Sequence, residues 1–269
     1  MSDIHSSAII DPHASIGRNV KIGPFCVIGP DVSLGDACVL ESHVVVTGQT
    51  MIGPRCHIFP YASIGHMPQD LKFDGEDTRL EIGSDNRIRE HVTMNPGTSG
   101  GGGVTRIGNH GLFMVGVHIA HDCMVGDHVV MANNATLAGH VEVGDHAIFG
   151  GMSAIHQFCR VGEYGFLGGG SIVVGDIIPF GSVTGNRASL AGLNLVGLKR
   201  GGFERAHIND LRAAYKMIFG QTQGGNDALA LRLNRARADY PDSPLVMRLL
   251  DFMEAGVGRG YSMPPDSKE

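Results

Sequence analysis

The sequence has no tryptophan, no net positive charge and no long hydrophobic run. Its formal net charge is −6, which argues against a nucleic-acid partner. No apolar stretch approaches the ~18–20 residues that a membrane-spanning helix needs. The N-terminus, MSDIHSSAII, has neither a basic segment nor a long apolar segment, so it is not a secretory signal. Together these absences predict a cytoplasmic protein.

Glycine, in contrast, is abundant, with 40 of 269 residues, and it takes part in a six-residue repeat. An apolar residue recurs at every sixth position from Ile10 to Ile64, and again, one residue out of phase, from Ile107 to Val173. The residue after it is often glycine, and the fifth residue of each unit is usually small. A six-residue period does not match the 3.6 residues of a helical turn, and interior glycines would be costly in a helix.

Each hexapeptide therefore predicts a short strand followed by a corner. The small position and the next apolar position lie two residues apart, so both face the core side of the strand. Three units make one triangular coil of about 18 residues. Such repeats resemble the left-handed parallel β-helix, and the left hand is taken from that resemblance alone. We expect this all-β solenoid over residues 1–185, with loop insertions near 65–81 and 95–106.

The repeat stops after about Gly185. Apolar residues at helical spacing predict helices over 206–219, 227–238 and 243–254. We therefore expect a C-terminal α-helical domain at 186–269 that caps or packs beside the open end of the solenoid.

All five cysteines occupy the small, core-facing position of the repeat, and no C-x-x-C pair of the kind that binds metals is present. We expect these cysteines to behave as small buried hydrophobic residues, in a protein of a reducing compartment. The five are Cys26, Cys38, Cys56, Cys123 and Cys159.

Of the 14 histidines, six fall at one corner position of the repeat and are expected to be solvated turn residues: His13, His43, His91, His110, His128 and His146. Three others, His121, His140 and His156, recur at intervals close to 18 residues, so we expect them to stack along one edge. His118 points out of a strand at the entrance to this edge. Such imidazoles could serve as a general base or could hold Zn²⁺, as in γ-type carbonic anhydrases, and the spacing leaves both open.

Three segments, HIAHDC at 118–123, ANNATLAGH at 132–140 and GGMSAIHQFC at 150–159, resemble the family of acyl-[acyl-carrier-protein]:UDP-N-acetylglucosamine O-acyltransferases. QDLK at 69–72 and GLKR at 197–200 do so too, and the resemblance covers nearly the whole chain. It implies transfer of a hydroxyacyl chain from acyl carrier protein to the glucosamine 3-hydroxyl of UDP-N-acetylglucosamine, the first step of lipid A synthesis. It also implies a homotrimer with sites between subunits, and neither a metal nor a cofactor.

The same resemblance implies residue roles. His121 would be the general base, Asp122 would support it, and the backbone N–H of Gly139 would hold the oxyanion. Glycine at Gly169 implies that a long acyl chain is accepted. Contacts with the substrates are expected from His118, His140, His156 and Gln157, from the loop residues Gln69, Asp70 and Lys72, and, at the nucleotide end, from Asn194 and Arg200. Basic residues of the tail are candidates for docking the acidic carrier: Lys199, Arg200, Arg205, Arg212 and Lys216.

The tail departs from the family pattern at Arg187, Val196 and Gly201, where His, Glu and Arg are common. These changes bear on nucleotide and carrier contacts, and they leave open an acceptor with a 3-amino group. Three different activities also stay open: the N-acyltransferase of the same pathway, an acetyl-CoA-dependent transferase and a zinc-dependent hydratase of the γ-carbonic-anhydrase type. A non-catalytic solenoid is disfavoured, because polar residues concentrate along one corner.

Overall fold

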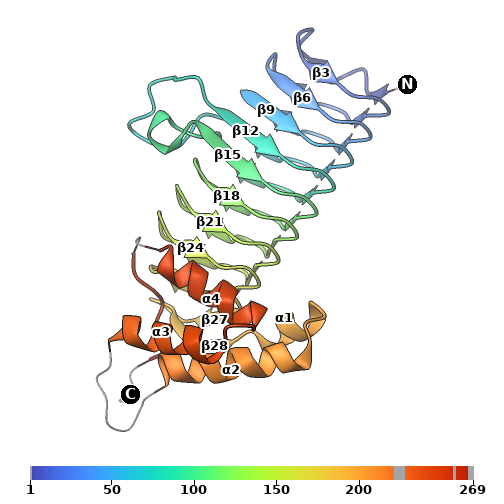
Figure 1. The fold of residues 1–269 in the computed structure, drawn as a ribbon. Helices are drawn as coiled ribbons and strands as arrows, with labels where there is room; N and C mark the ends of the chain where they lie inside the picture. The colour runs from blue at the N-terminus through green and yellow to red at the C-terminus, as the bar shows by residue number, and fades with distance from the viewer. Residues whose placement is uncertain (1, 221–227, 257–258, 266–269) are drawn as a thin grey trace.

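The computed structural model describes residues 2–220, 228–256 and 259–265. Short strands stack into a three-sided parallel β-helix, and four helices follow at its C-terminal end (Figure 1). The predicted β-helix with a helical C-terminal part is thereby confirmed.

Three sheets form the sides of the prism. Sheet A contains β1 (Asp3–Ile4), β4 (Lys21–Ile22), β7 (Val39–Leu40), β10 (His57–Ile58), β13 (Arg87–Ile88), β16 (Leu112–Phe113), β19 (Val130–Met131), β22 (Ile148–Phe149), β25 (Phe166–Leu167), β27 (Gly181–Thr184) and β28 (Ser189–Leu193). Sheet B contains β2 (Ile9–Ile10), β5 (Val27–Ile28), β8 (Val45–Val46), β11 (Ser63–Ile64), β14 (Thr93–Met94), β17 (His118–Ile119), β20 (Thr136–Leu137), β23 (Ala154–Ile155) and β26 (Ile172–Val173). Sheet C contains β3 (Ser15–Ile16), β6 (Val32–Leu34), β9 (Gln49–Ile52), β12 (Arg79–Ile82), β15 (Val104–Ile107), β18 (Met124–Val125), β21 (Glu142–Val143) and β24 (Arg160–Val161).

The register of the strands shows where the coil is interrupted. Within the regular coils a residue pairs with the residue 18 positions later, as Val39 does with His57. His57 pairs 30 positions on, with Arg87, and Arg87 pairs 25 positions on, with Leu112. The two longer intervals place the predicted loops between β11 and β12 and between β14 and β15. Both loops extend from the same side of the prism (Figure 1). They are shorter than predicted, because residues 79–81 and 104–106, which the sequence pattern assigns to the loops, belong to strands.

The interior of the prism is apolar along its whole length. The second residue of most strands is buried, and all five cysteines are fully buried, as predicted. Burial raises the pKa of the Cys123 thiol to about 12, so this thiol is a packing residue rather than a nucleophile.

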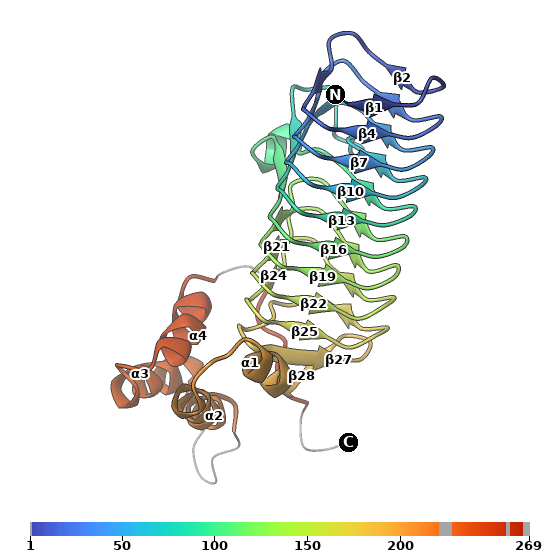
Figure 2. The same cartoon turned by 90° about the vertical axis from the view of Figure 1, so that its right-hand side faces the viewer.

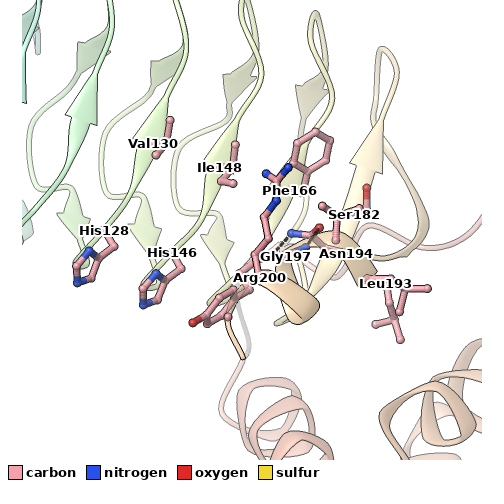
Figure 3. Close-up of a pocket in the computed structure, with 14 residues that line it drawn as sticks. His128, Val130, His146, Ile148, Phe166, Ser182, Leu193, Asn194, Gly197 and Arg200 are labelled. Carbon is pink, nitrogen blue, oxygen red and sulfur yellow. Dashed lines mark hydrogen bonds between the residues drawn. The ribbon is translucent and has the colours of Figure 1, made fainter. Parts of the chain in front are cut away.

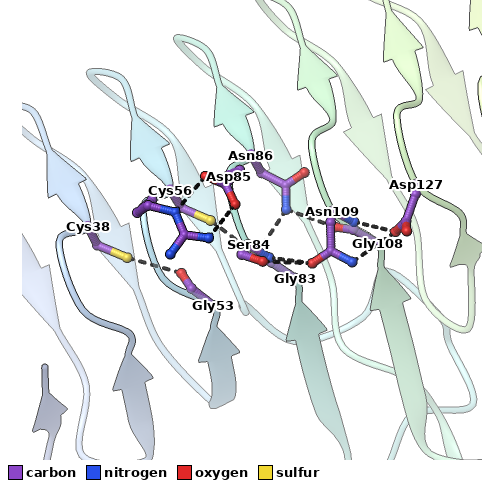
Figure 4. A network of polar contacts seen from close by, with 11 residues as sticks. Cys38, Gly53, Cys56, Gly83, Ser84, Asp85, Asn86, Gly108, Asn109 and Asp127 are labelled. Atoms are coloured by element: carbon purple, nitrogen blue, oxygen red, sulfur yellow. Dashed lines mark hydrogen bonds and ion pairs between the residues drawn. The ribbon is translucent and has the colours of Figure 1, made fainter.

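The corners carry aromatic and polar ladders. The histidines predicted to be solvated turn residues do lie at corners, but His110, His128, His146 and Tyr164 stack on one another, with ring centroids 4.6–4.8 Å apart. Figure 4 shows a polar ladder on the same edge. Within it, the buried side chain of Asn86 donates to the carbonyls of Gly83 and Gly108 and accepts from the N–H of Gly111.

The β-helix ends in an antiparallel hairpin of β27 and β28. The helices that follow are α1 (Leu195–Arg200), α2 (Arg205–Phe219), α3 (Leu229–Asp239) and α4 (Pro244–Glu254). Figure 2 shows α1 against the end of sheet A and α2–α4 beside it. The three predicted helices are confirmed as α2, α3 and α4, although residue 227, the predicted start of the second, lies outside the described residues. Helix α1 was not predicted. The division into two domains at residue 185 stays a prediction. Within the described ranges, no helix has the length and apolarity to span a bilayer.

Candidate active site

A histidine–aspartate pair with a buried carboxylate lies at the corner between sheets B and C. His121 and Asp122 follow β17, and Nδ1 of His121 is 2.7 Å from Oδ2 of Asp122. Asp122 is only 4% exposed, and the ring of His121 is partly exposed. With Nδ1–H donating to the carboxylate, Nε2 of His121 carries the free lone pair, which is the arrangement a general base needs.

The second loop encloses the carboxylate of Asp122. The N–H of Thr98 donates to Oδ1 at 2.8 Å, and the hydroxyl of Thr98 donates to Oδ2 at 2.6 Å. The N–H of Asp122 in turn donates to the hydroxyl of Thr105 at 2.7 Å. A Cβ on Gly101 would lie 2.0 Å from Cγ of Asp122, so only glycine fits there. We did not predict any of these three partners.

Gly139 lies against the ring of His121, one coil further along. A Cβ on Gly139 would be 2.5 Å from Cε1 of His121. Within the described chain the N–H of Gly139 has no hydrogen-bond partner, while its carbonyl accepts from the N–H of Phe158. The amide is therefore free to donate to a ligand beside His121.

The predicted row of three imidazoles is only partly formed. The rings of His121 and His140 are 5.0 Å apart and perpendicular. His140 stacks on Phe158 at 4.4 Å instead of on His156, which is exposed beside Gln157. The cause is the corner geometry: His140 and Phe158 occupy the same corner position of successive coils, and both have positive φ, whereas His156 lies two residues earlier.

Two histidines of this edge have lowered pKa values. His118 is half-buried on β17, and its Nδ1 is 2.7 Å from the hydroxyl of Thr93. Burial lowers the pKa of His118, and the neighbouring His121 lowers it further. Burial also lowers the pKa of His140, against an opposing effect of Asp122. Both shifts favour neutral imidazoles near pH 7, which suits contacts with a polar ligand.

The first loop brings Asp70 and Lys72 to this corner. Both line a cavity of about 250 Å³ together with His140, Phe158 and Thr98. Gln69 is exposed on the same loop and does not line the cavity. The structure thus places two of the three predicted loop residues at the histidine edge.

Asn194 and Arg200 line a different cavity, of about 750 Å³, over sheet A (Figure 3). Its lining shares no residue with the smaller cavity. Asn194 caps α1: its Oδ1 accepts from the N–H of Gly197, and its Nδ2 donates to the carbonyl of Tyr164. Arg200 extends from α1 toward Phe166. A single chain therefore does not bring these two residues together with His121.

The three tail positions that are expected to depart from the family pattern lie near this larger cavity or on the surface. Val196 is exposed and lines the cavity, and Arg187 is exposed at the hairpin turn. A Cβ on Gly201 would lie 2.9 Å from ring atoms of Tyr164 and Phe203, so the packing of these rings leaves little room for a side chain there. At Gly169, in contrast, a Cβ would meet nothing closer than the carbonyl of Gly151, 3.4 Å away.

Comparison with known proteins agrees with this architecture. A family model described as UDP N-acetylglucosamine O-acyltransferase, domain 2, matches residues 176–262, and one described as bacterial transferase hexapeptide (six repeats) matches residues 13–48. The acyl-[acyl-carrier-protein]–UDP-N-acetylglucosamine O-acyltransferase of Rickettsia bellii is 52% identical over 261 residues, covering 97% of this chain and 91% of that protein. The chain belongs to this O-acyltransferase family.

Other O-acyltransferases of the family are also similar to this chain over nearly its whole length. That of Thermodesulfovibrio yellowstonii is 48% identical over 257 residues, covering 95% of this chain and 97% of that protein. The solved structure of LpxA from Acinetobacter baumannii superposes with a TM-score of 0.91 at 44% identity, covering 96% of this chain and 98% of that one. The predicted family and the predicted enzyme class, an acyltransferase, are confirmed.

Proposed function

We propose that this O-acyltransferase transfers a hydroxyacyl chain from acyl carrier protein to the glucosamine 3-hydroxyl of UDP-N-acetylglucosamine, in the cytoplasm, as the first step of lipid A biosynthesis. The names of its relatives support the acceptor and the donor. The observation that carries the chemistry is the His121–Asp122 pair, in which the carboxylate is buried and Nε2 of His121 is free, with Gly139 packed against the imidazole ring.

In the proposed reaction Nε2 of His121 takes the proton of the sugar hydroxyl while its oxygen attacks the thioester carbonyl. Asp122 holds Nδ1–H and stabilises the imidazolium that forms. The developing oxyanion accepts a hydrogen bond from the N–H of Gly139. When the C–S bond breaks, the proton on His121 passes to the leaving thiolate, so that an ester and a free thiol remain.

The other predicted residues have roles in binding. We assign sugar and phosphate contacts to His140, Asp70 and Lys72, because they share one cavity beside His121. We assign further substrate contacts to His118, His156, Gln157 and Gln69, and contacts with the nucleotide to Asn194 and Arg200. Glycine at Gly169, where an added Cβ would already contact the carbonyl of Gly151 at 3.4 Å, suits a long acyl chain. The candidates for docking the acidic carrier are all exposed on α1 and α2: Lys199, Arg200, Arg205, Arg212 and Lys216.

The site is proposed to be completed between the subunits of a homotrimer. In one chain the residues assigned to the sugar and those assigned to the nucleotide line separate cavities. An apolar stripe also runs along the outer face of sheet A, formed by Leu112, Val130, Ile148 and Phe166, all half-buried in the single chain. The last three of these residues also line the larger cavity. A second copy docked on this stripe would join the two half-sites.

Mixed trimers test this arrangement. Inactive His121→Ala and Arg200→Ala chains are refolded together at equal amounts. If each site takes His121 from one subunit and Arg200 from its neighbour, random assembly restores about a quarter of the wild-type activity. If both residues act within one chain, the mixture stays as inactive as its parents, and light scattering shows whether a trimer is present at all.

The general base is tested by His121→Ala in an acyl-transfer assay with UDP-N-acetylglucosamine and acyl carrier proteins of graded chain length. We expect a loss of about 10²–10⁴-fold in kcat with an unchanged assembly. His91→Ala is the matched control, because His91 is an exposed corner histidine that stacks on Tyr61. If the His121→Ala enzyme retains more than a tenth of the wild-type rate, His121 is not the general base.

A zinc-dependent hydratase is the competing function that a specific observation favours. Ligand atoms of His121, Asp122 and His140 lie within 4.8 Å of one another, the one such group among the described residues. However, both carboxylate oxygens of Asp122 already accept hydrogen bonds from Thr98, and Nδ1 of His121 faces Asp122. This donor set does not suit a zinc ion. Acyl transfer that is unaffected by a chelator supports the acyltransferase proposal. Stoichiometric zinc together with bicarbonate dehydration activity opposes it.

A further inference from the structure

The carboxylate of Asp122 is held from two directions. His121 donates to Oδ2 from the corner, while Thr98 donates to both oxygens from the second loop. All three donors lie within 2.6–2.8 Å of their acceptors, and both Asp122 and Thr98 are 4% exposed. A buried carboxylate depends on such donors, because solvent does not reach it.

The second loop is shaped for this contact. Thr98 precedes the short 3₁₀-helix η1 (Ser99–Gly101), but its side chain makes no capping hydrogen bond to that helix. Instead its carbonyl accepts from the N–H groups of Gly101 and Gly103, which frees the hydroxyl for Asp122. The loop then passes over the carboxylate at Gly101, where a side chain would clash. The contact spans 24 residues of sequence.

We propose that Thr98 is a positioning residue for His121 and acts through Asp122; the inference rests on the general-base role proposed above for His121. Nδ1 of His121 and the hydroxyl of Thr98 share the same oxygen, Oδ2, while the N–H of Thr98 fixes the other oxygen. This two-point contact sets the plane of the carboxylate. The carboxylate in turn sets the tautomer and the direction of the imidazole.

A direct role in substrate binding is the competing explanation for Thr98, because Thr98 also lines the small cavity with Asp70 and His140. The two roles differ in kinetics. Loss of a substrate contact made equally in the ground state and the transition state raises KM, whereas misalignment of the base lowers kcat.

The experiment compares Thr98→Val, which removes the hydroxyl at nearly constant shape, with Thr98→Ser, which keeps it. Thr50→Val is the matched control, because Thr50 is a fully buried threonine whose hydroxyl donates to the carbonyl of Thr47 at the same 2.6 Å. Each substitution is also made in an Asp122→Asn background. Acyl transfer to UDP-N-acetylglucosamine gives kcat and KM, and thermal unfolding shows that each variant is folded.

We expect Thr98→Val to lower kcat by about 10- to 100-fold, the effect of losing a hydrogen bond to a charged group, with KM changed less than about twofold. Thr98→Ser should stay within about threefold of the wild type, and Thr50→Val should leave kcat unchanged. In the Asp122→Asn background, Thr98→Val should cost less than about a further twofold, because the two residues act as one unit.

Three results overturn the inference: wild-type kcat in Thr98→Val, an effect confined to KM, or an undiminished effect in the Asp122→Asn background. His121→Ala, measured in the same series, keeps the underlying proposal separate. If His121→Ala is inactive while Thr98→Val is fully active, only the positioning role is wrong. If His121→Ala is active, the general-base mechanism itself is wrong.

Discussion

Replacement of Gly139 by alanine should disable the enzyme by moving one ring. The new Cβ would lie 2.5 Å from Cε1 and 2.7 Å from Nε2 of His121. Carbon atoms in ordinary contact are about 3.5–4.0 Å apart, so the imidazole must retreat by about 1 Å. A misplacement of this size can cost about 10²-fold in rate. The backbone N–H of residue 139 remains, so the loss is assigned to His121 rather than to the oxyanion donor.

The assay is the initial rate of acyl transfer to UDP-N-acetylglucosamine at saturating substrates, and we expect Gly139→Ala to lose about 30- to 100-fold in kcat. Gly151→Ala is the matched control: Gly151 lies at a later corner, and its Cβ would meet only the carbonyl of Asn133, at 3.4 Å. Both variants should unfold near the wild-type temperature. A Gly139→Ala enzyme within threefold of the wild-type rate would refute the placement of His121.

Three further predictions concern acyl length, pH and stability. Gly169→Met should fold normally, because its Cβ has room, and should lower kcat/KM for long acyl chains by about tenfold or more relative to short ones, measured with carriers of graded length. The pKa of His118 lies below its ordinary value of 6.5, so the unfolded chain takes up its proton first; the stability linked to this residue is present above pH 6.5 and lost as the pH falls. Thermal unfolding between pH 7 and 5 should therefore show a smaller loss for His118→Gln than for the wild type. Asn86→Ala should destabilise the coil by about 2–4 kcal/mol in denaturant unfolding, because the buried N–H of Gly111 loses its partner and the partly buried carbonyls of Gly83 and Gly108 each lose a donor.

The regular coils could be predicted from the sequence because their contacts repeat at a fixed interval. Once the six-residue period is known, each residue of a coil has an assigned side of its strand, and the burial of Cys26 and Cys159 follows from that assignment. The helices α2 and α4 were predictable for a similar reason, since their apolar residues recur at helical spacing and are buried. Where the sequence is periodic, it is sufficient to predict the secondary structure and the buried side chains.

The parts that were missed have no period. The contact of Thr98 with Asp122 depends on how an aperiodic loop folds back over 24 residues, and the glycine run around Gly101 was its only trace in the sequence. Helix α1 is a single short element whose cap, Asn194, is predicted from the sequence only as a ligand contact. Phe158 replaces His156 as the partner of His140 because positive φ at the corner, not residue type, decides which rings stack.

The most direct test of the account is the identity of the product. The wild-type enzyme is incubated with acyl carrier proteins of graded chain length and either UDP-N-acetylglucosamine or its 3-amino analogue, and the products are analysed by mass spectrometry before and after mild base. We predict that UDP-N-acetylglucosamine gains one acyl group as a base-labile ester at the 3-oxygen. No acylated UDP-N-acetylglucosamine, or acylation of the amino analogue alone, would contradict the account.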